Sequence, residues 1–302
     1  MNTRVAPLDP AFIAVDGRRV EVFDTGASPE GDPVVVLLTG AGDTARSWLP
    51  VHRALARDLR VISYERSGIG ASAAGSPRTI AGMVAELTGV IETLAPDRTV
   101  LLVGHSFGAL VARIFAARHP ERVAGLVMID ATPDLLTSDR VRRFGYRFYV
   151  GSIAAARWAL PARVFARLVG ANALPYYPGR GPFLAALTPD ARTEWDRAVE
   201  AVFLGDAVDE MRAVLPGTAE ASIELRTMPP GDFPVALLTS GTYGRGWIRM
   251  HDAIARRYPA ATHQLSGDRF HNVHMRHIAL TAETVRTVLA SSRARRGGRP
   301  RA

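Results

Sequence analysis

One serine in this chain has the sequence context of a nucleophile. Ser106 is the central residue of a Gly-His-Ser-Phe-Gly stretch at 104–108. The apolar run 99–103 before it has the composition of a buried strand, and the run 109–118 after it has helical periodicity that ends before Pro120. A serine on such a strand-to-helix turn adopts a cramped backbone, which small residues two before and two after it make possible. Because its hydroxyl then stands clear of the sheet, beside amides at a helix N-terminus that can stabilise an oxyanion, we predict that Ser106 is a nucleophile.

The segments around this serine alternate between strand-like and helix-like sequence. The chain opens with a predicted β-hairpin, 12–15 and 20–23, joined by an Asp-Gly turn. The alternation after the hairpin predicts right-handed crossovers and an α/β fold with a mostly parallel sheet, covered by helices on both faces. Predicted strands lie at 34–39, 59–64, 99–103, 123–129, 235–239 and 262–265, and predicted helices near 45–57, 79–94, 107–118, 247–257 and 278–291.

Four motifs resemble those of the α/β-hydrolase superfamily, and they follow one another along the chain in the same order as in that family. The segment 33–42 resembles the strand and loop that supply half of that family's oxyanion hole. The segments 64–72 and 119–130 resemble the turn after the family's next strand and the run from the nucleophile helix into the following strand. The segment 270–274 resembles the loop that carries the catalytic histidine. The resemblance covers most of the chain and implies the α/β-hydrolase fold.

The alternation of strands and helices stops between 132 and 232, where several aromatic and arginine-rich segments have helical character. Many members of the family carry a cap over the active site at this point. We therefore predict a core domain formed by 1–132 and 233–292, and a helical cap at 133–232. The basic, amphipathic stretch 142–168 keeps membrane association open as an alternative. Most of the following aromatic residues are expected to form the insertion's own core, while some apolar surface faces the pocket: Phe144, Tyr146, Phe148, Tyr149, Trp158 and Phe165.

The resemblance also implies partners for Ser106, since an unassisted hydroxyl is a poor nucleophile at neutral pH. His271 lies between the last predicted strand and the last predicted helix, where the family places its base, and His274 is the second choice. Many relatives carry the acid after the strand 235–239, but the loop that follows this strand here contains no carboxylate. A subset of the family uses the end of the strand after the nucleophile helix, which is the position of Asp130. A turn cap is the alternative role for that residue, and the poorer acid candidates are Asp134, Asp252 and Asp268.

Two backbone amides are expected to form the oxyanion hole, those of Ala41 and Phe107. Glycines on both sides of Ala41 would let that loop bend away from the strand and aim its amide inward. The family often has a histidine where Thr39 stands, so the hydrogen bonds that brace this loop are expected to differ here. His105, next to the nucleophile, is expected to be a pocket or packing residue.

Composition limits the classes of protein that the chain can belong to. The formal net charge is +8, and five of the arginines lie in 293–302, which we predict to be a basic, disordered tail. No nucleic-acid partner is expected, although binding of the tail to an anionic surface stays an alternative. The chain has no cysteine, which excludes disulfides, thiolate metal sites and a cysteine nucleophile.

No metal or cofactor is predicted. The spacing of His271, His274 and His277 is compatible with metal binding, but no acidic or thiol ligand accompanies them. No apolar run is long enough to span a membrane, and the N-terminus lacks the pattern of a signal peptide. We therefore expect a cytoplasmic protein.

These expectations describe a serine hydrolase with a helical cap, acting on a small-molecule carboxylic ester of small or medium apolar character through an acyl-enzyme. A serine in place of an aspartate nucleophile argues against the family's dehalogenases and epoxide hydrolases. Hydrolysis of thioesters, lactones, peptides or carbon–carbon bonds stays open, since a fold does not fix a substrate. A ligand-binding protein without enzymatic activity is the alternative from another class, and the oligomeric state is not predicted.

Overall fold

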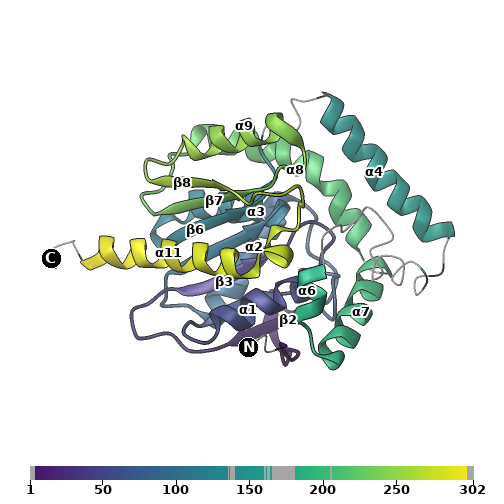
Figure 1. The fold of residues 1–302 in the computed structure, drawn as a ribbon, viewed down its shortest axis with the longest axis horizontal. Helices are drawn as coiled ribbons and strands as arrows, with labels where there is room; N and C mark the ends of the chain where they lie inside the picture. The colour runs from purple at the N-terminus through teal and green to yellow at the C-terminus, as the bar shows by residue number, and fades with distance from the viewer. Residues whose placement is uncertain are drawn as a thin grey trace.

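One mixed sheet organises the computed structural model, which describes residues 4–134, 136, 140–159, 161, 164, 181–204 and 206–297. In space its strands follow the order β1-β2-β4-β3-β5-β6-β7-β8. The pairs β1–β2 and β2–β4 are antiparallel and every other neighbouring pair is parallel, so the hairpin extends one edge of a parallel sheet (Figure 1). The strands are β1 (Ala11–Val15), β2 (Arg18–Thr25), β3 (Val34–Leu38), β4 (Val61–Tyr64), β5 (Val100–His105), β6 (Val123–Ile129), β7 (Val235–Thr239) and β8 (Ala261–Leu265).

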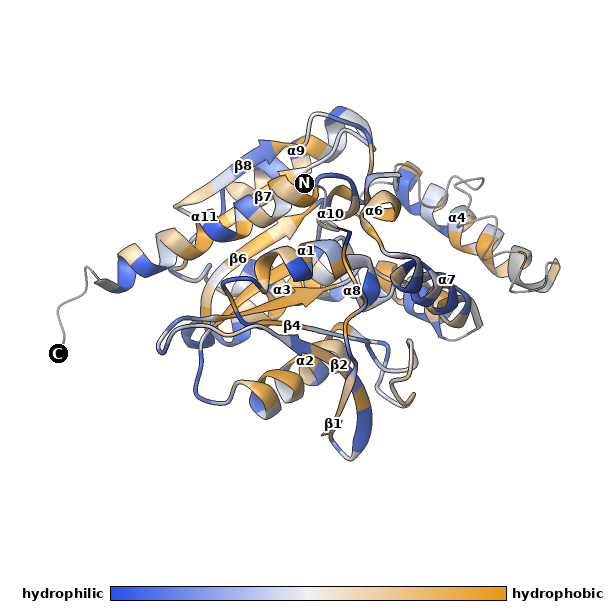
Figure 2. Ribbon diagram, turned by 60° about the horizontal axis from the view of Figure 1, so that its bottom comes forward, coloured by the Kyte–Doolittle hydropathy of each residue, from blue (hydrophilic) through white to orange (hydrophobic). Residues whose placement is uncertain are grey.

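Both faces of the sheet are covered, as the apolar runs of the central strands require. In β5, Val100 and Leu102 belong to one hydrophobic cluster, and Leu101 and Val103 belong to a second cluster on the opposite face. The colouring of Figure 2 shows β6 as hydrophobic along its length. Helices α2 (Ile80–Leu94), α3 (Phe107–Arg118) and α9 (Gly244–Ala255) contribute to the first cluster, and α1 (Leu49–Leu55) and α11 (Ile278–Gly297) to the second.

The described residues between 133 and 232 form helices and contain no strand, apart from one β-bridge between Val5 and Leu187. These helices build a further hydrophobic cluster with the N-terminal segment, in which the rings of Phe183 and Trp195 meet edge to face at 4.7 Å. They are α4 (Arg140–Ala159), α6 (Gly181–Ala186), α7 (Pro189–Leu204) and α8 (Ala207–Thr227). The short helices η1 (Ala45–Trp48), η2 (Pro120–Arg122) and α10 (Val273–Arg276) complete the described elements.

Two of the aromatic side chains expected to form the core of this insertion face solvent instead. Phe144 is 74% exposed and Phe148 is 72% exposed, while Tyr146 and Tyr149 on the same helix α4 are partly buried. A sequence of alternating arginine and aromatic residues gives no means of deciding which stripe of a helix faces inward. Phe165 and the side chain of Trp158 lie outside the described residues.

The C-terminal segment also differs from its prediction. Helix α11 continues to Gly297, so residues 293–297 do not form the predicted disordered tail, and residues 298–302 lie outside the described part. Arginine favours helix, and two acids from distant segments pair with this last part: Asp32 with Arg293 and Asp232 with Arg295, both at 2.6 Å. No helix in the described part of the chain is long and apolar enough to cross a membrane.

Candidate active site

Ser106 occupies a strained turn between β5 and α3. Its φ of 51° and ψ of −118° lie in a region that residues other than glycine rarely adopt. The glycines on either side allow the surrounding chain to close on this turn. A Cβ at Gly104 would lie 2.4 Å from the Cα of Ala109, and a Cβ at Gly108 would lie 2.3 Å from the carbonyl oxygen of Thr39. The small residues of the predicted strand-turn-helix motif are therefore a steric requirement.

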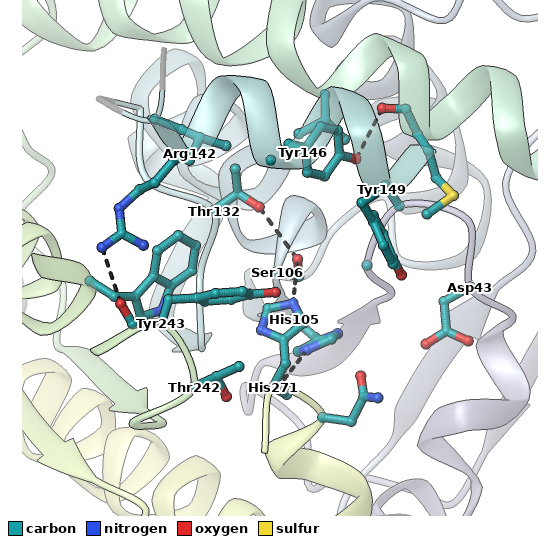
Figure 3. Close-up of a pocket in the computed structure, with 18 residues that line it drawn as sticks. Asp43, His105, Ser106, Thr132, Arg142, Tyr146, Tyr149, Thr242, Tyr243 and His271 are labelled. Atoms are coloured by element: carbon teal, nitrogen blue, oxygen red, sulfur yellow. Dashed lines mark hydrogen bonds between the residues drawn. The ribbon is translucent and has the colours of Figure 1, made fainter. Parts of the chain in front are cut away.

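The structure brings the side chains of Ser106 and Asp130 within hydrogen-bond distance of His271. His271 lies in the loop after β8, and its Nε2 is 2.9 Å from the hydroxyl oxygen of Ser106 (Figure 3). Its Nδ1 is 2.6 Å from Oδ2 of Asp130, the residue that directly follows β6. With Nδ1–H donating to the carboxylate, Nε2 is left to accept a hydrogen bond from the serine hydroxyl. This arrangement can draw the proton from Ser106 as its oxygen attacks an electrophile.

Asp130 is fully buried and accepts hydrogen bonds from two further residues. Ser240 donates from its backbone N–H at 3.0 Å and from its hydroxyl at 2.8 Å, and the indole N–H of Trp247 donates at 2.9 Å. Burial alone would raise the pKa of this carboxyl group, but the hydrogen bond and charge of His271, with the help of Ser240, hold it below its ordinary value. Asp130 is therefore ionised at neutral pH. Sequence reasoning missed Ser240 and Trp247, although Ser240 follows β7 at the same edge of the sheet.

The other candidate histidines and acids have different partners. His274 is buried against Trp48, and its Nε2 is 3.4 Å from the hydroxyl of Ser47. Burial lowers the pKa of His274 to about 3. His105 donates from Nε2 to the carbonyl oxygen of His271 at 3.0 Å, and burial lowers its pKa well below the ordinary value. The poorer acid candidates pair elsewhere: Asp134 with Arg113, Asp252 with His263, and Asp268 with His277 and Arg276.

A buried ion pair holds the loop that carries Ala41. Arg66 donates to the carbonyl oxygens of Thr39 and Gly40, at 2.8 Å and 2.6 Å, and to the hydroxyl of Thr39. Glu210, on α8, accepts from Arg66 and from the backbone N–H of Gly42 at 2.6 Å. The pair therefore holds the loop backbone on both sides of Ala41. Glu210 lies 144 residues from Arg66 in sequence, with no local motif that could have indicated its role.

Glu210→Gln is expected to lower the free energy of unfolding by about 3 kcal/mol, because it leaves the buried guanidinium of Arg66 without its counter-charge. The matched control is Glu224→Gln on the same helix, which removes a partly exposed pair with Arg118 and should cost below about 1 kcal/mol. Urea denaturation followed by circular dichroism measures both values. Equal losses in the two variants would contradict the bracing role of Glu210.

A cavity of about 480 Å³ lies over Ser106. Its lining includes Ser106, His271 and Ala41, and helices α4 and α8 of the insertion contribute further side chains. Figure 3 shows Tyr146 and Tyr149 of α4 in this lining. The lining is mainly apolar and aromatic. Its larger side chains are those of Leu136, Tyr146, Tyr149, Met211, Val214, Tyr243 and Trp247, and its polar ones include Asp43, Thr132, Arg142, Thr242 and Asn272.

Part of the chain matches a known family model and several curated proteins. Residues 33–157 match a family model described as the alpha/beta hydrolase fold. An AB hydrolase superfamily protein from Gibberella zeae is 36% identical over 107 residues, 34% of this chain and 33% of that protein. The proposed carbamate hydrolase RutD of Yersinia enterocolitica is 35% identical over 118 residues, 38% of this chain and 42% of that protein. The chain thus spans about a third to two fifths of these curated relatives.

Solved structures match over nearly the whole chain at lower sequence identity. An enol-lactonase from Burkholderia xenovorans LB400 superposes with a TM-score of 0.68 at 18% identity, covering 93% of this chain and 100% of that one. An esterase from Exiguobacterium antarcticum gives a TM-score of 0.70 at 17% identity, covering 94% and 100%. At this level of identity the likeness concerns the fold. The chain therefore has the α/β-hydrolase fold, and its residues 33–157 are similar to the alpha/beta hydrolase family model.

Proposed function

We propose that this protein is a serine hydrolase that cleaves carboxylic esters of small to medium apolar character through an acyl-enzyme intermediate. The observation that carries the proposal is the chain of hydrogen bonds from Asp130 through His271 to Ser106, at 2.6 Å and 2.9 Å. A buried, ionised carboxylate keeps the imidazole in the tautomer that accepts the serine proton, and it offsets the charge that then appears on the ring. We further propose a cytoplasmic location, which the lack of cysteine supports.

In the proposed reaction, Oγ of Ser106 attacks the ester carbonyl carbon while its proton moves to Nε2 of His271. The alcohol leaves with that proton, and the acyl group stays bound to Ser106. His271 then takes a proton from water, whose oxygen attacks the acyl carbon. As the bond from the acyl carbon to Oγ breaks and the carboxylic acid leaves, Nε2 returns this proton to Oγ of Ser106. The backbone N–H groups of Ala41 and Phe107 are proposed to stabilise the oxyanion in both steps.

The substrate class is supported by the cavity. A volume of about 480 Å³ with a mainly apolar and aromatic lining suits an acyl chain of small to medium size. A panel of p-nitrophenyl esters with increasing acyl length, extended by a thioester, a lactone and a peptide substrate, measures the preference directly. We expect the highest kcat/KM with an apolar acyl ester.

The experiment that tests the proposed mechanism is rapid mixing of the protein with a p-nitrophenyl ester. An acyl-enzyme whose hydrolysis is slower than its formation releases one equivalent of p-nitrophenol per protein molecule in a burst. A ligand-binding protein without enzymatic activity would release none. The absence of both a burst and steady turnover across the whole panel would refute the proposal.

The insertion is proposed to act as a cap that selects the acyl group, and two neighbouring residues of α4 allow a matched test. Tyr149 lines the cavity, whereas Phe148 faces solvent. Tyr149→Ala should open space for additional methylene groups and shift the ratio of kcat/KM for long over short acyl esters by about tenfold. Phe148→Ala should leave the ratio unchanged. A shift of equal size in both variants would contradict the cap assignment.

A further inference from the structure

Three side chains from separate segments converge beside the cavity. Asp43 lies in the loop after β3, His105 ends β5 next to Ser106, and His274 belongs to α10. One carboxylate oxygen of Asp43 and one ring nitrogen of each histidine lie within 4.8 Å of one another. All three side chains are at most 4% exposed. Two imidazoles and a carboxylate form a ligand set that divalent transition-metal ions favour in proteins.

Each histidine of this cluster is held by a hydrogen bond through one ring nitrogen, and Asp43 accepts a hydrogen bond from a neighbouring backbone amide. Nε2 of His105 donates to the carbonyl oxygen of His271, and Nε2 of His274 is 3.4 Å from the hydroxyl of Ser47. Oδ1 of Asp43 accepts from the backbone N–H of Thr44 at 2.9 Å. Metal-binding histidines are oriented in this way, with the second ring nitrogen bonded to a carbonyl or another polar group.

The second ring nitrogen of each histidine, Nδ1, indicates that a ligand binds here. Nδ1 of His105 and Nδ1 of His274 are both buried and have no hydrogen-bond partner among the described residues. A buried polar atom without a partner is costly, because it has lost its hydrogen bonds to water and gained none. The rings of the two histidines lie 4.4 Å apart between centroids, so one bound species can contact both nitrogens.

We propose that Asp43, His105 and His274 bind a divalent transition-metal ion, for which Zn²⁺ is the probe. The ligands of a tetrahedral zinc ion stand roughly 3.3 Å apart, so modest side-chain rotations within the observed 4.8 Å suffice to form the site. Asp43 and His105 also line the cavity, which leaves an open position for a water molecule. The bound ion would link three loops, those that carry Ala41, Ser106 and His271.

This inference goes beyond the proposed function and does not depend on it. The metal ligands are separate from Ser106, His271 and Asp130, and metal binding is measured without any substrate. Ser106→Ala should therefore bind the metal as the unaltered protein does. Loss of esterase activity with retained metal binding, or the reverse, separates the two proposals.

The test is isothermal titration calorimetry, in which the full-length protein is first treated with a chelator and then titrated with Zn²⁺. The visible absorption spectrum of the protein with Co²⁺ in place of Zn²⁺ reports on the ligands that bind the ion. We expect one ion per chain with a dissociation constant in the micromolar range or lower. His274→Phe keeps a ring stacked on Trp48 but removes the ligand, and should weaken binding by at least about 100-fold. Asp43→Asn, which can still accept the hydrogen bond from Thr44, should also weaken it by at least about 100-fold and serves if His274→Phe does not fold.

The control is His119→Phe, the same substitution at a partly exposed ring that stacks on Phe115 outside the cluster. It should bind Zn²⁺ like the unaltered protein. The proposal is overturned if the unaltered protein does not bind Zn²⁺ with one-to-one stoichiometry. It is equally overturned if Asp43→Asn binds as tightly as the control, or if a crystal soaked with Zn²⁺ shows only water between the three side chains.

Discussion

Ser106→Ala is expected to abolish ester hydrolysis and labelling by a fluorophosphonate probe while the protein stays folded. The side chain is small, and its contacts are the hydrogen bond to His271 and a longer approach to the hydroxyl of Thr132 at 3.4 Å. Its removal should therefore affect chemistry far more than packing. In a well-studied serine protease, replacing the catalytic serine lowers kcat by about 10⁶-fold, because the serine and its base act together. We expect a loss of that order for Ser106→Ala.

Ser291→Ala is the control for this experiment. Ser291 is exposed on α11, where its hydroxyl bonds to a backbone carbonyl of the same helix. The control should be labelled and active like the unaltered protein, and thermal unfolding should show that both variants fold. If the probe labels Ser106→Ala as strongly as Ser291→Ala, the nucleophile is another residue and the proposed mechanism fails.

The parts of the fold that depend on the residue pattern within a short segment could be predicted from the sequence. Buried parallel strands such as β3 and β5 are continuous apolar runs between turn residues, and the structure has them at the predicted positions. The turn at Ser106 was predictable for a related reason. Its glycines are needed because a side chain at either position would clash with nearby backbone, and the glycines stand within the same short motif as the serine. Asp130 follows from topology, since the ends of neighbouring parallel strands meet at one edge of a sheet.

Features that depend on distant segments were not predictable. Arg66 and Glu210 meet only because α8 of the insertion packs over the loop after β3. No acid was assigned as a partner of His274 from the sequence, so no metal site was predicted there, yet the fold brings Asp43 beside it from a distant segment of the chain. The orientation of α4 is a further case. Its arginines and aromatic residues allow several inward faces, and only contacts with the remainder of the chain select the one that turns Tyr149 toward the cavity.

Asp130→Asn is expected to slow turnover by about 10⁴-fold, the loss measured when a triad aspartate is made neutral in this way. The asparagine side chain has nearly the same shape, but it can present its NH₂ group to His271. Nδ1 would then accept a hydrogen bond, and the proton would move to Nε2, where it prevents the ring from taking the serine proton. The asparagine also lacks the charge that stabilises the imidazolium. The measurement is kcat/KM with the best ester of the panel.

Asp252→Asn and Asp268→Asn are matched controls, since each removes a carboxylate that pairs with a histidine other than His271. Each should lower kcat/KM by less than about tenfold, which corresponds to about 1.4 kcal/mol in the barrier. The surroundings of Asp130 sharpen the comparison, because Ser240 and Trp247 also donate to its carboxylate. The backbone N–H of Ser240 and the indole N–H of Trp247 both bond to Oδ1, whereas His271 bonds to Oδ2. An asparagine that keeps its oxygen toward those two donors therefore turns its NH₂ group to His271. If Asp130→Asn stays within tenfold of the unaltered protein while Asp252→Asn or Asp268→Asn falls by orders of magnitude, the acid is misassigned, and the roles of Ser106 and His271 would stand without it.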